Sequence, residues 1–250
     1  MTLTTLTITD LTRMSGNRVC IAGVTNDYRT IRPEFEHSVI TEDWLFDQAG
    51  NIVIRPFARV RLDLLKNCPQ PPHTEDWLVR PDVKLSEGLL SLDERKELLQ
   101  RIVDPNVAAI FGVEIQHEPG YFMRENEGSR SLGTVKVARL DDVTHHCYDG
   151  KWDYRISFTD RAGENYRLSV TDLAFRVYVD YLRETQGVDC DQIGYLLERQ
   201  FQKSTVFLRI GLARPTWAKH PHCCFLQING IYSFPDYLEG RCFADFRSNN

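Results

Sequence analysis

The second half of the chain alternates apolar and polar residues with the period of two that predicts β-strands. Within residues 151–160 the large apolar side chains fall on one face: Trp152, Tyr154, Ile156 and Phe158. Lysine and arginine side chains fall on the opposite face. The same pattern predicts strands at 134–143, 151–160, 165–170, 206–213 and 223–228.

A pair of helices is predicted between the third and fourth of these strands, over residues 172–202. Thr171 or Asp172 is placed to cap the first helix, and Asp189 or Asp191 to cap the second. Three strands, a helical insertion and two further strands follow the order of an OB-fold barrel.

The first half of the chain is less regular. Strands are predicted at 18–24 and 49–65, and Ser91 with Glu94 forms a capping box that opens a helix over 91–103. The first fourteen residues lack a basic leader followed by an apolar core, so they are interpreted as a loose tail and not as a secretory signal. The polar, glycine-rich stretch 116–133 is the predicted boundary between an N-terminal unit, 1–120, and a C-terminal unit, 134–250.

Several segments resemble a bacterial family described as dual OB-containing domain proteins: RVCIAGV at 18–24, IRP at 31–33, LRIGLARP at 208–215 and FLQINGIYSFPDYLEG at 225–240. The resemblance implies a mainly β protein with α-helical insertions, built as two OB-fold-like barrels in tandem. It also implies a role in nucleic-acid binding, within bacterial defence or stress systems. It supplies no catalytic residues.

The overall charge argues against a protein that coats nucleic acid through bulk electrostatics, because the net charge is −5 and the pI about 5.8. The last fifty residues nevertheless carry more cations than anions. The seven cysteines are odd in number and follow no export signal, so reduced thiols in a cytoplasmic protein are expected. No apolar run is long enough for a membrane helix.

The candidate binding residues lie on the outer faces of the C-terminal strands and in the loops beside them. The strand cations are Lys136, Lys151, Arg155, Arg167 and Arg209; the loop residues are Tyr148, Arg214, Trp217 and Lys219. We expect the cations to contact phosphates and Tyr148 and Trp217 to stack on bases of a single strand. The alternative is that the cations only solvate a barrel surface and that Trp217 covers the end of the barrel.

Two catalytic or metal-binding alternatives are weaker. The clusters His145–His146–Cys147 and His220, His222, Cys223 would bind zinc only if their loops met, and their spacing matches no zinc motif. Asp141, Asp153 and Asp160 would be the carboxylates of a metal-dependent nuclease. No metal and no cofactor are expected.

The leading hypothesis is therefore a non-catalytic module that binds single-stranded DNA or RNA, as an accessory component of a bacterial defence or stress system beside a protein partner from that system. The alternatives are a protein-interaction or scaffold subunit that binds no nucleic acid, and a metal-dependent nuclease. The acidic pI favours the scaffold subunit; the cationic outer face and the Trp217 loop favour nucleic-acid binding.

Overall fold

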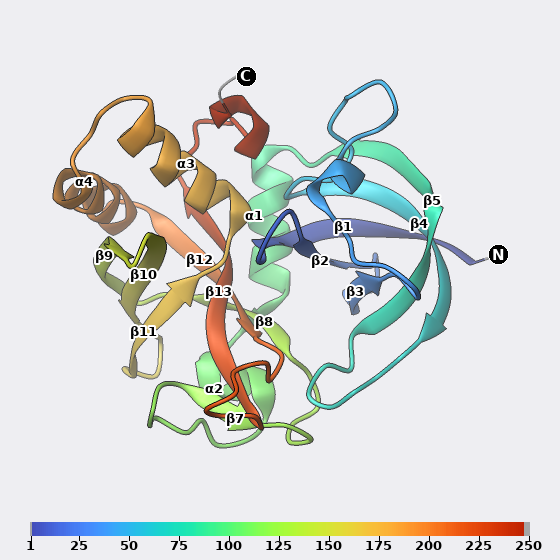
Figure 1. Ribbon diagram of the computed structural model, residues 1–250, viewed down its shortest axis with the longest axis horizontal. Coiled ribbons are helices and arrows are strands. Elements are labelled where there is room, and N and C mark those ends of the chain that lie inside the picture. The colour runs from blue at the N-terminus through green and yellow to red at the C-terminus, as the bar shows by residue number, and fades with distance from the viewer. Residues whose placement is uncertain (1, 248–250) are drawn as a thin grey trace.

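The computed structural model describes residues 2–247, and its first half folds into a closed barrel (Figure 1). Its strands are β1 (Thr2–Arg13), β2 (Val19–Val24), β3 (Thr30–Glu34), β4 (Ala58–Asn67) and β5 (Asp76–Leu89). They close in the order β1-β2-β3-β5-β4, with β3 and β5 parallel and the other pairs antiparallel. This is the strand order of an OB-fold, and we call it the first barrel.

The interpretation of the first fourteen residues as a loose tail is wrong, because β1 is a long strand that pairs with both β2 and β4. Leu6, Ile8 and Leu11 are fully buried in the barrel core. The register shifts between Ile8 and Asp10, and this bulge lets one strand follow the curvature of the barrel. Threonine-rich alternation is a strand pattern in its own right.

The second half of the chain forms another curved sheet. Its main strands are β8 (Leu132–Lys136), β9 (Arg139–Tyr148), β10 (Lys151–Thr159), β11 (Asn165–Val170), β12 (Thr205–Leu212) and β13 (Cys223–Phe234). Along the sheet they run β8-β12-β13-β11-β10-β9, with β11 and β13 parallel. Only Val137 and Ala138 separate β8 from β9, so these two are halves of one bent strand that pairs with β12 at one end and β10 at the other. The sheet thus curls back on itself in OB-fold order, and we call it the second barrel.

The remaining elements are short strands and helices around the barrels. They are η1 (Glu42–Leu45), α1 (Leu92–Arg101), β6 (Val103–Asp104), α2 (Val107–Phe111), β7 (Phe122–Arg124), α3 (Leu173–Glu184), α4 (Cys190–Gln202) and η2 (Phe243–Phe246). The predicted caps are confirmed: Ser91 and Glu94 form a capping box on α1, Asp172 caps α3 and Asp189 caps α4. The predicted limits of the two units, 1–120 and 134–250, stay a prediction.

The outer face of β1, β2 and β3 is almost completely buried, although it points away from the core of the first barrel. Asp10, Ala22, Val24 and Arg32 are each at most 4% exposed. The second barrel covers this face with β12 and β13, which run beside the first barrel in Figure 1. The hydroxyl of Tyr232 donates to the carbonyl of Thr9 across the junction, at 2.8 Å.

A buried ion pair lies at the centre of this junction. Arg209, in β12, contacts the Asp10 carboxylate through Nε at 2.9 Å and Nη2 at 2.8 Å, while its Nη1 donates to Thr134 Oγ1 at 2.7 Å. Arg209 and Asp10 are 1% and 2% exposed. The prediction that Arg209 is a solvent-facing phosphate contact is therefore wrong: it points out of its own barrel, but into the other one.

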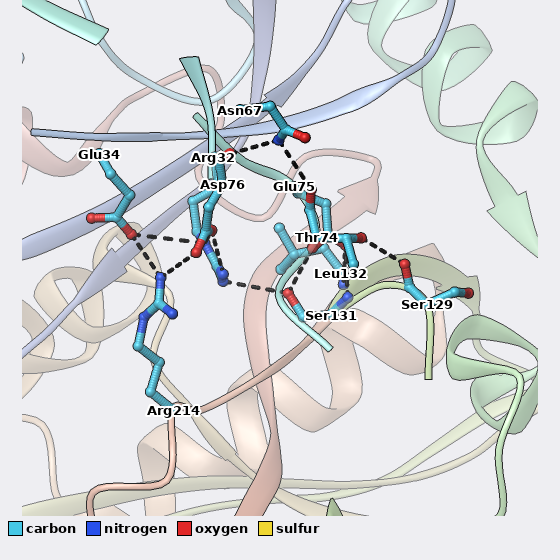
Figure 2. A network of polar contacts seen from close by, with 10 residues as sticks. All are labelled: Arg32, Glu34, Asn67, Thr74, Glu75, Asp76, Ser129, Ser131, Leu132 and Arg214. Atoms are coloured by element: carbon cyan, nitrogen blue, oxygen red, sulfur yellow. Dashed lines mark hydrogen bonds and ion pairs between the residues drawn. The ribbon is translucent and has the colours of Figure 1, made fainter. Parts of the chain in front are cut away.

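A second polar network joins the barrels, as Figure 2 shows. The Arg32 guanidinium contacts Asp76 at 2.6 Å, and Arg214 contacts both Asp76 at 2.6 Å and Glu34 at 3.1 Å. The Glu75 carboxylate accepts the backbone N–H groups of Ser131 and Leu132, at 2.7 and 3.2 Å, where the chain enters β8. Charge-assisted bonds of this kind fix the orientation of one barrel on the other.

His73 lies close to this network and is only 3% exposed. Burial, reinforced by the positive charges of Arg32 and Arg214, lowers the pKa of His73 to about 3. Within residues 2–247 neither ring nitrogen has a hydrogen-bond partner. The imidazole is therefore held neutral in the folded protein.

Replacing Arg209 by methionine is expected to lower the free energy of unfolding by about 3–5 kcal/mol, because Asp10 then becomes a buried charge without its partner. The double replacement Asp10→Leu with Arg209→Met is expected to recover much of this loss. Urea denaturation followed by circular dichroism measures both. A free energy of unfolding for Arg209→Met within about 0.5 kcal/mol of the wild type, as for a surface substitution, would contradict the role of the pair.

Acid is expected to weaken the fold through His73. Its folded pKa lies below the value near 6.5 of an unfolded histidine, so between these values only the unfolded state binds the proton. The free energy of unfolding should fall by about 2 kcal/mol from pH 7 to pH 5 through this one group. Urea denaturation at both pH values measures this fall. In His73→Leu, the fall in the free energy of unfolding from pH 7 to pH 5 should be smaller than in the wild type by this amount. An identical drop in both proteins would contradict the assignment.

Candidate nucleic-acid interface

An OB-fold binds its ligands on the outer side of its second and third strands, between the loops that join strands one to two and four to five. In the first barrel these strands are β2 and β3, and their outer side is the face buried by the second barrel. In the second barrel the corresponding strands are β10 and β11. Their outer face lies on the side of the second barrel away from the first (Figure 1).

The strand register places the predicted cations side by side on this outer face. Arg155 lies opposite Thr144 of β9 and Ser169 of β11, and the next pair along β10 and β11 is Ser157 with Arg167. Lys151 begins β10 at the end of the β9–β10 hairpin. We call Lys151, Arg155 and Arg167 the β10–β11 cations.

These cations differ in whether a neighbouring carboxylate already neutralises their charge. Arg155 Nε contacts the Asp153 carboxylate at 2.6 Å, so its charge is partly neutralised. Arg167 donates to Thr144 Oγ1 at 3.1 Å. Among the described residues, neither Arg167 nor Lys151 has a carboxylate within ion-pair distance, and both are exposed. Arg167 and Lys151 are thus the cations most available to a phosphate.

The loop between the predicted strands 134–143 and 151–160 is shorter than those ranges imply. β9 continues through His145 and His146 to Tyr148, and only Asp149 and Gly150 form the turn before Lys151. Asp149 has φ 50° and Gly150 has φ 73°, the left-handed conformations that Asp-Gly adopts in two-residue hairpin turns. The turn holds Tyr148 at the tip with 64% of its surface exposed.

The apolar face of β10 and β11 points inward as predicted. Tyr154, Ile156, Phe158 and Tyr166 are all buried, and the guanidinium of Arg183 lies 3.6 Å from the ring centre of the half-buried Trp152. Burial, together with the hydrogen bond to Asp180, raises the pKa of the Tyr154 phenol to about 12. These aromatic side chains are therefore part of the core and unavailable for stacking on a base.

The loop between β12 and β13 presents Trp217 with half of its surface exposed. One side of the indole packs on the His220 and Phe225 rings, with centroids 4.7 and 5.5 Å away. Lys219 of the same loop is exposed. A tryptophan supported on one side and open on the other suits a stacking contact.

The structure does not bring every predicted residue to this surface. Arg209 is buried at the junction, and Arg214 turns toward Glu34 and Asp76 of the first barrel. Lys136 is exposed, but its position opposite Phe207 places it in the part of the second barrel that packs on α1. The predicted residues that remain on this surface are the half-buried Arg155 and the exposed Tyr148, Lys151, Arg167, Trp217 and Lys219.

The histidine and cysteine clusters do not converge. His145 is buried beside Trp152 and Tyr154, where burial and then the charge of Arg183 lower its pKa. His222 instead contacts Glu125, with Nδ1 3.2 Å from Oε2. Within residues 2–247 no three His, Cys, Asp or Glu side chains are grouped as a metal site would require.

The carboxylates of the nuclease alternative are held apart. Asp160 is buried and accepts the backbone N–H groups of Val107, Ala162 and Glu164. Asp153 contacts Arg155, and Asp141 contacts Arg139. Each carboxylate thus has a local structural partner, and a two-metal arrangement, in which shared carboxylates hold ions about 3.5–4 Å apart, is not what this geometry forms.

Both barrels show the OB-fold strand order, and a family model described as a dual OB-containing domain matches residues 11–231. The chain belongs to the dual OB-containing domain family. The match begins within β1 and ends within β13, so it covers both barrels of this family member. No curated protein matches the chain significantly. Of the helices in residues 2–247, none combines the length and apolar character needed to cross a bilayer.

Proposed function

We propose that this dual OB-containing domain protein binds single-stranded DNA or RNA across the outer face of β10 and β11. The observation that carries the proposal is the contrast between the barrels. The same OB-fold surface is buried in the first barrel and exposed in the second, where Lys151 lies opposite Tyr148 and Arg167 lies farther along the same face. The first barrel then serves as the support on which the second presents its face.

The proposed contacts divide into phosphate and base contacts. Lys151, Arg155 and Arg167 neutralise phosphates, and release of the counterions from the strand drives binding. Tyr148 and Trp217 stack on bases, a contact that every base offers. Stacking on exposed side chains requires bases that are not already paired and stacked in a duplex, and this supports a single-stranded ligand.

The carboxylates on this surface are consistent with a binding role of modest strength. Asp142 and Asp153 interleave with the cations, since Asp142 lies opposite Ser157 and Asp153 contacts Arg155. The protein as a whole is acidic. Binding therefore depends on a few local contacts, and we propose a non-catalytic accessory role beside a protein from the same bacterial defence or stress system.

A second candidate function is protein binding through α4. Tyr195 and Leu196 lie on this helix with 55% and 49% of their surfaces exposed, which is unusual for adjacent large apolar side chains. Such a contact would depend on apolar burial, so its affinity would respond little to salt.

Charge reversal of the two uncommitted cations tests the proposed face. Fluorescence anisotropy of labelled single-stranded DNA and RNA should show binding to the wild type that weakens as salt rises. In Lys151→Glu with Arg167→Glu, affinity should fall steeply, and the slope of log K against log salt should flatten by about 0.7 for each lost phosphate contact. The matched control is Lys66→Glu, an exposed lysine of the first barrel. If the wild type bound no oligonucleotide at low salt, the proposal would be contradicted.

Removing the aromatic contacts should weaken binding without changing its salt dependence. Tyr148→Ala and Trp217→Ala are each expected to cost about 1–3 kcal/mol of binding free energy, because one stacked base is lost. Tyr195→Ala on α4 is the matched control and should leave oligonucleotide affinity unchanged. If Tyr195→Ala were the variant that lost affinity, α4 and not the β10–β11 face would be the contact surface.

A further inference from the structure

A cavity of about 50 Å³ lies where the first barrel, α1 and the C-terminal segment meet. Its walls come from the end of β5, the loop before β4, α1, the start of α3, the end of β13 and residues 236–243. A cavity needs roughly 10–15 Å³ to hold one water, so this one accommodates about three to five water-sized groups. That is the size of a tetrahedral oxyanion such as phosphate.

Arginines from three separate segments line this cavity: Arg55, Arg95 and Arg241. Arg95 is anchored through Nε to the Leu90 carbonyl, at 2.9 Å, with its guanidinium 5.3 Å from the Phe57 ring centre. Arg241 is more exposed and lies 3.6 Å from Glu239. Across residues 2–247, neither Arg55 nor Arg95 forms an ion pair, although the charge of Asp236 acts on Arg95 and Asp245 feels the charge of Arg55.

Two carboxylates also line the cavity, and backbone groups bind the oxygens of both. Asp172 accepts the N–H groups of Ala174 and Ile231, each at 2.8 Å. Asp236 accepts those of Leu238 at 3.1 Å and Gly240 at 2.9 Å. These carboxylates are therefore bound to the chain around them. Arg55 contacts the Cys242 thiol and Arg95 contacts the Leu90 carbonyl, so what both guanidinium groups lack within residues 2–247 is an ion-pair partner.

Arg55 and Arg95, which lack ion-pair partners in the described chain, also repel one another. Burial lowers the pKa of Arg95, the charge of Asp236 opposes this shift, and the charge of Arg55 lowers the pKa further. Holding two cations near one half-enclosed cavity costs free energy unless an anion lies between them. Planar guanidinium groups that converge from different segments are the usual protein partners of phosphate oxygens.

We propose that this cavity binds a phosphate-sized oxyanion between Arg55 and Arg95, with Arg241 at its more exposed side. The anion would link the first barrel, α1 and the C-terminal segment, since each contributes one of the arginines. Binding would therefore stabilise the folded protein. The site lies in different residues from the β10–β11 face and does not depend on the proposed nucleic-acid binding.

Thermal unfolding of the full chain with inorganic phosphate tests the site against sodium chloride of equal ionic strength. The wild type should show a saturable rise in Tm of about 5 °C at low-millimolar phosphate, where general salting effects are small. Arg55→Gln with Arg95→Gln should abolish the rise. The matched control Arg101→Gln, on the same helix but outside the cavity, should keep it.

A folding check, a second variant and a second ligand separate the possible outcomes. Circular dichroism in chloride shows whether the double variant is folded; if it is not, Arg95→Lys is used and should weaken the phosphate response. Lys151→Glu with Arg167→Glu should keep the full rise, which separates this site from the nucleic-acid face. A nucleoside 5′-monophosphate that matches phosphate would identify a terminal phosphate group as the ligand, and a response to phosphate alone would identify the free anion. No rise in the wild type, or an equal rise in the folded double variant, would overturn the proposal.

Discussion

The packing of one barrel onto the ligand face of the other is the constraint on which the rest of the structure depends. The Asp10–Arg209 pair lies inside this junction, where both charges are removed from water and each requires the other. Around it, Thr134 and Tyr232 satisfy further polar groups, and the Arg32–Asp76–Arg214 network adds a second contact between the barrels. This arrangement decides which OB-fold surface remains exposed.

Local patterns were sufficient to predict the second barrel. Alternation located its strands, and the aspartates before α3 and α4 located the helices, because caps and alternation are short-range signals. The Asp149-Gly150 dipeptide is an equally local signal for the tight turn that exposes Tyr148, and it could have shortened the predicted loop. The threonine-rich alternation of β1 could likewise have been recognised as a strand.

The contacts of Arg209 and Arg214 with the first barrel could not be predicted from such local patterns. Alternation shows which side of its own sheet a residue occupies, but it does not show whether another part of the chain covers that side. Asp10 lies 199 positions from Arg209 in the sequence, and no local pattern joins them. The same limit applies to His73 and to the cavity arginines, whose neighbours come from distant segments.

The shared junction also makes the halves of this protein interdependent during its synthesis. The Asp10 carboxylate emerges from the ribosome long before Arg209 exists, so the outer face of β1–β3 must remain without its cover until β12 has been translated. A nascent chain that ends before β12 therefore carries an exposed charge and an uncovered strand face. Completion of the native first barrel is tied to the arrival of the last strands of the second.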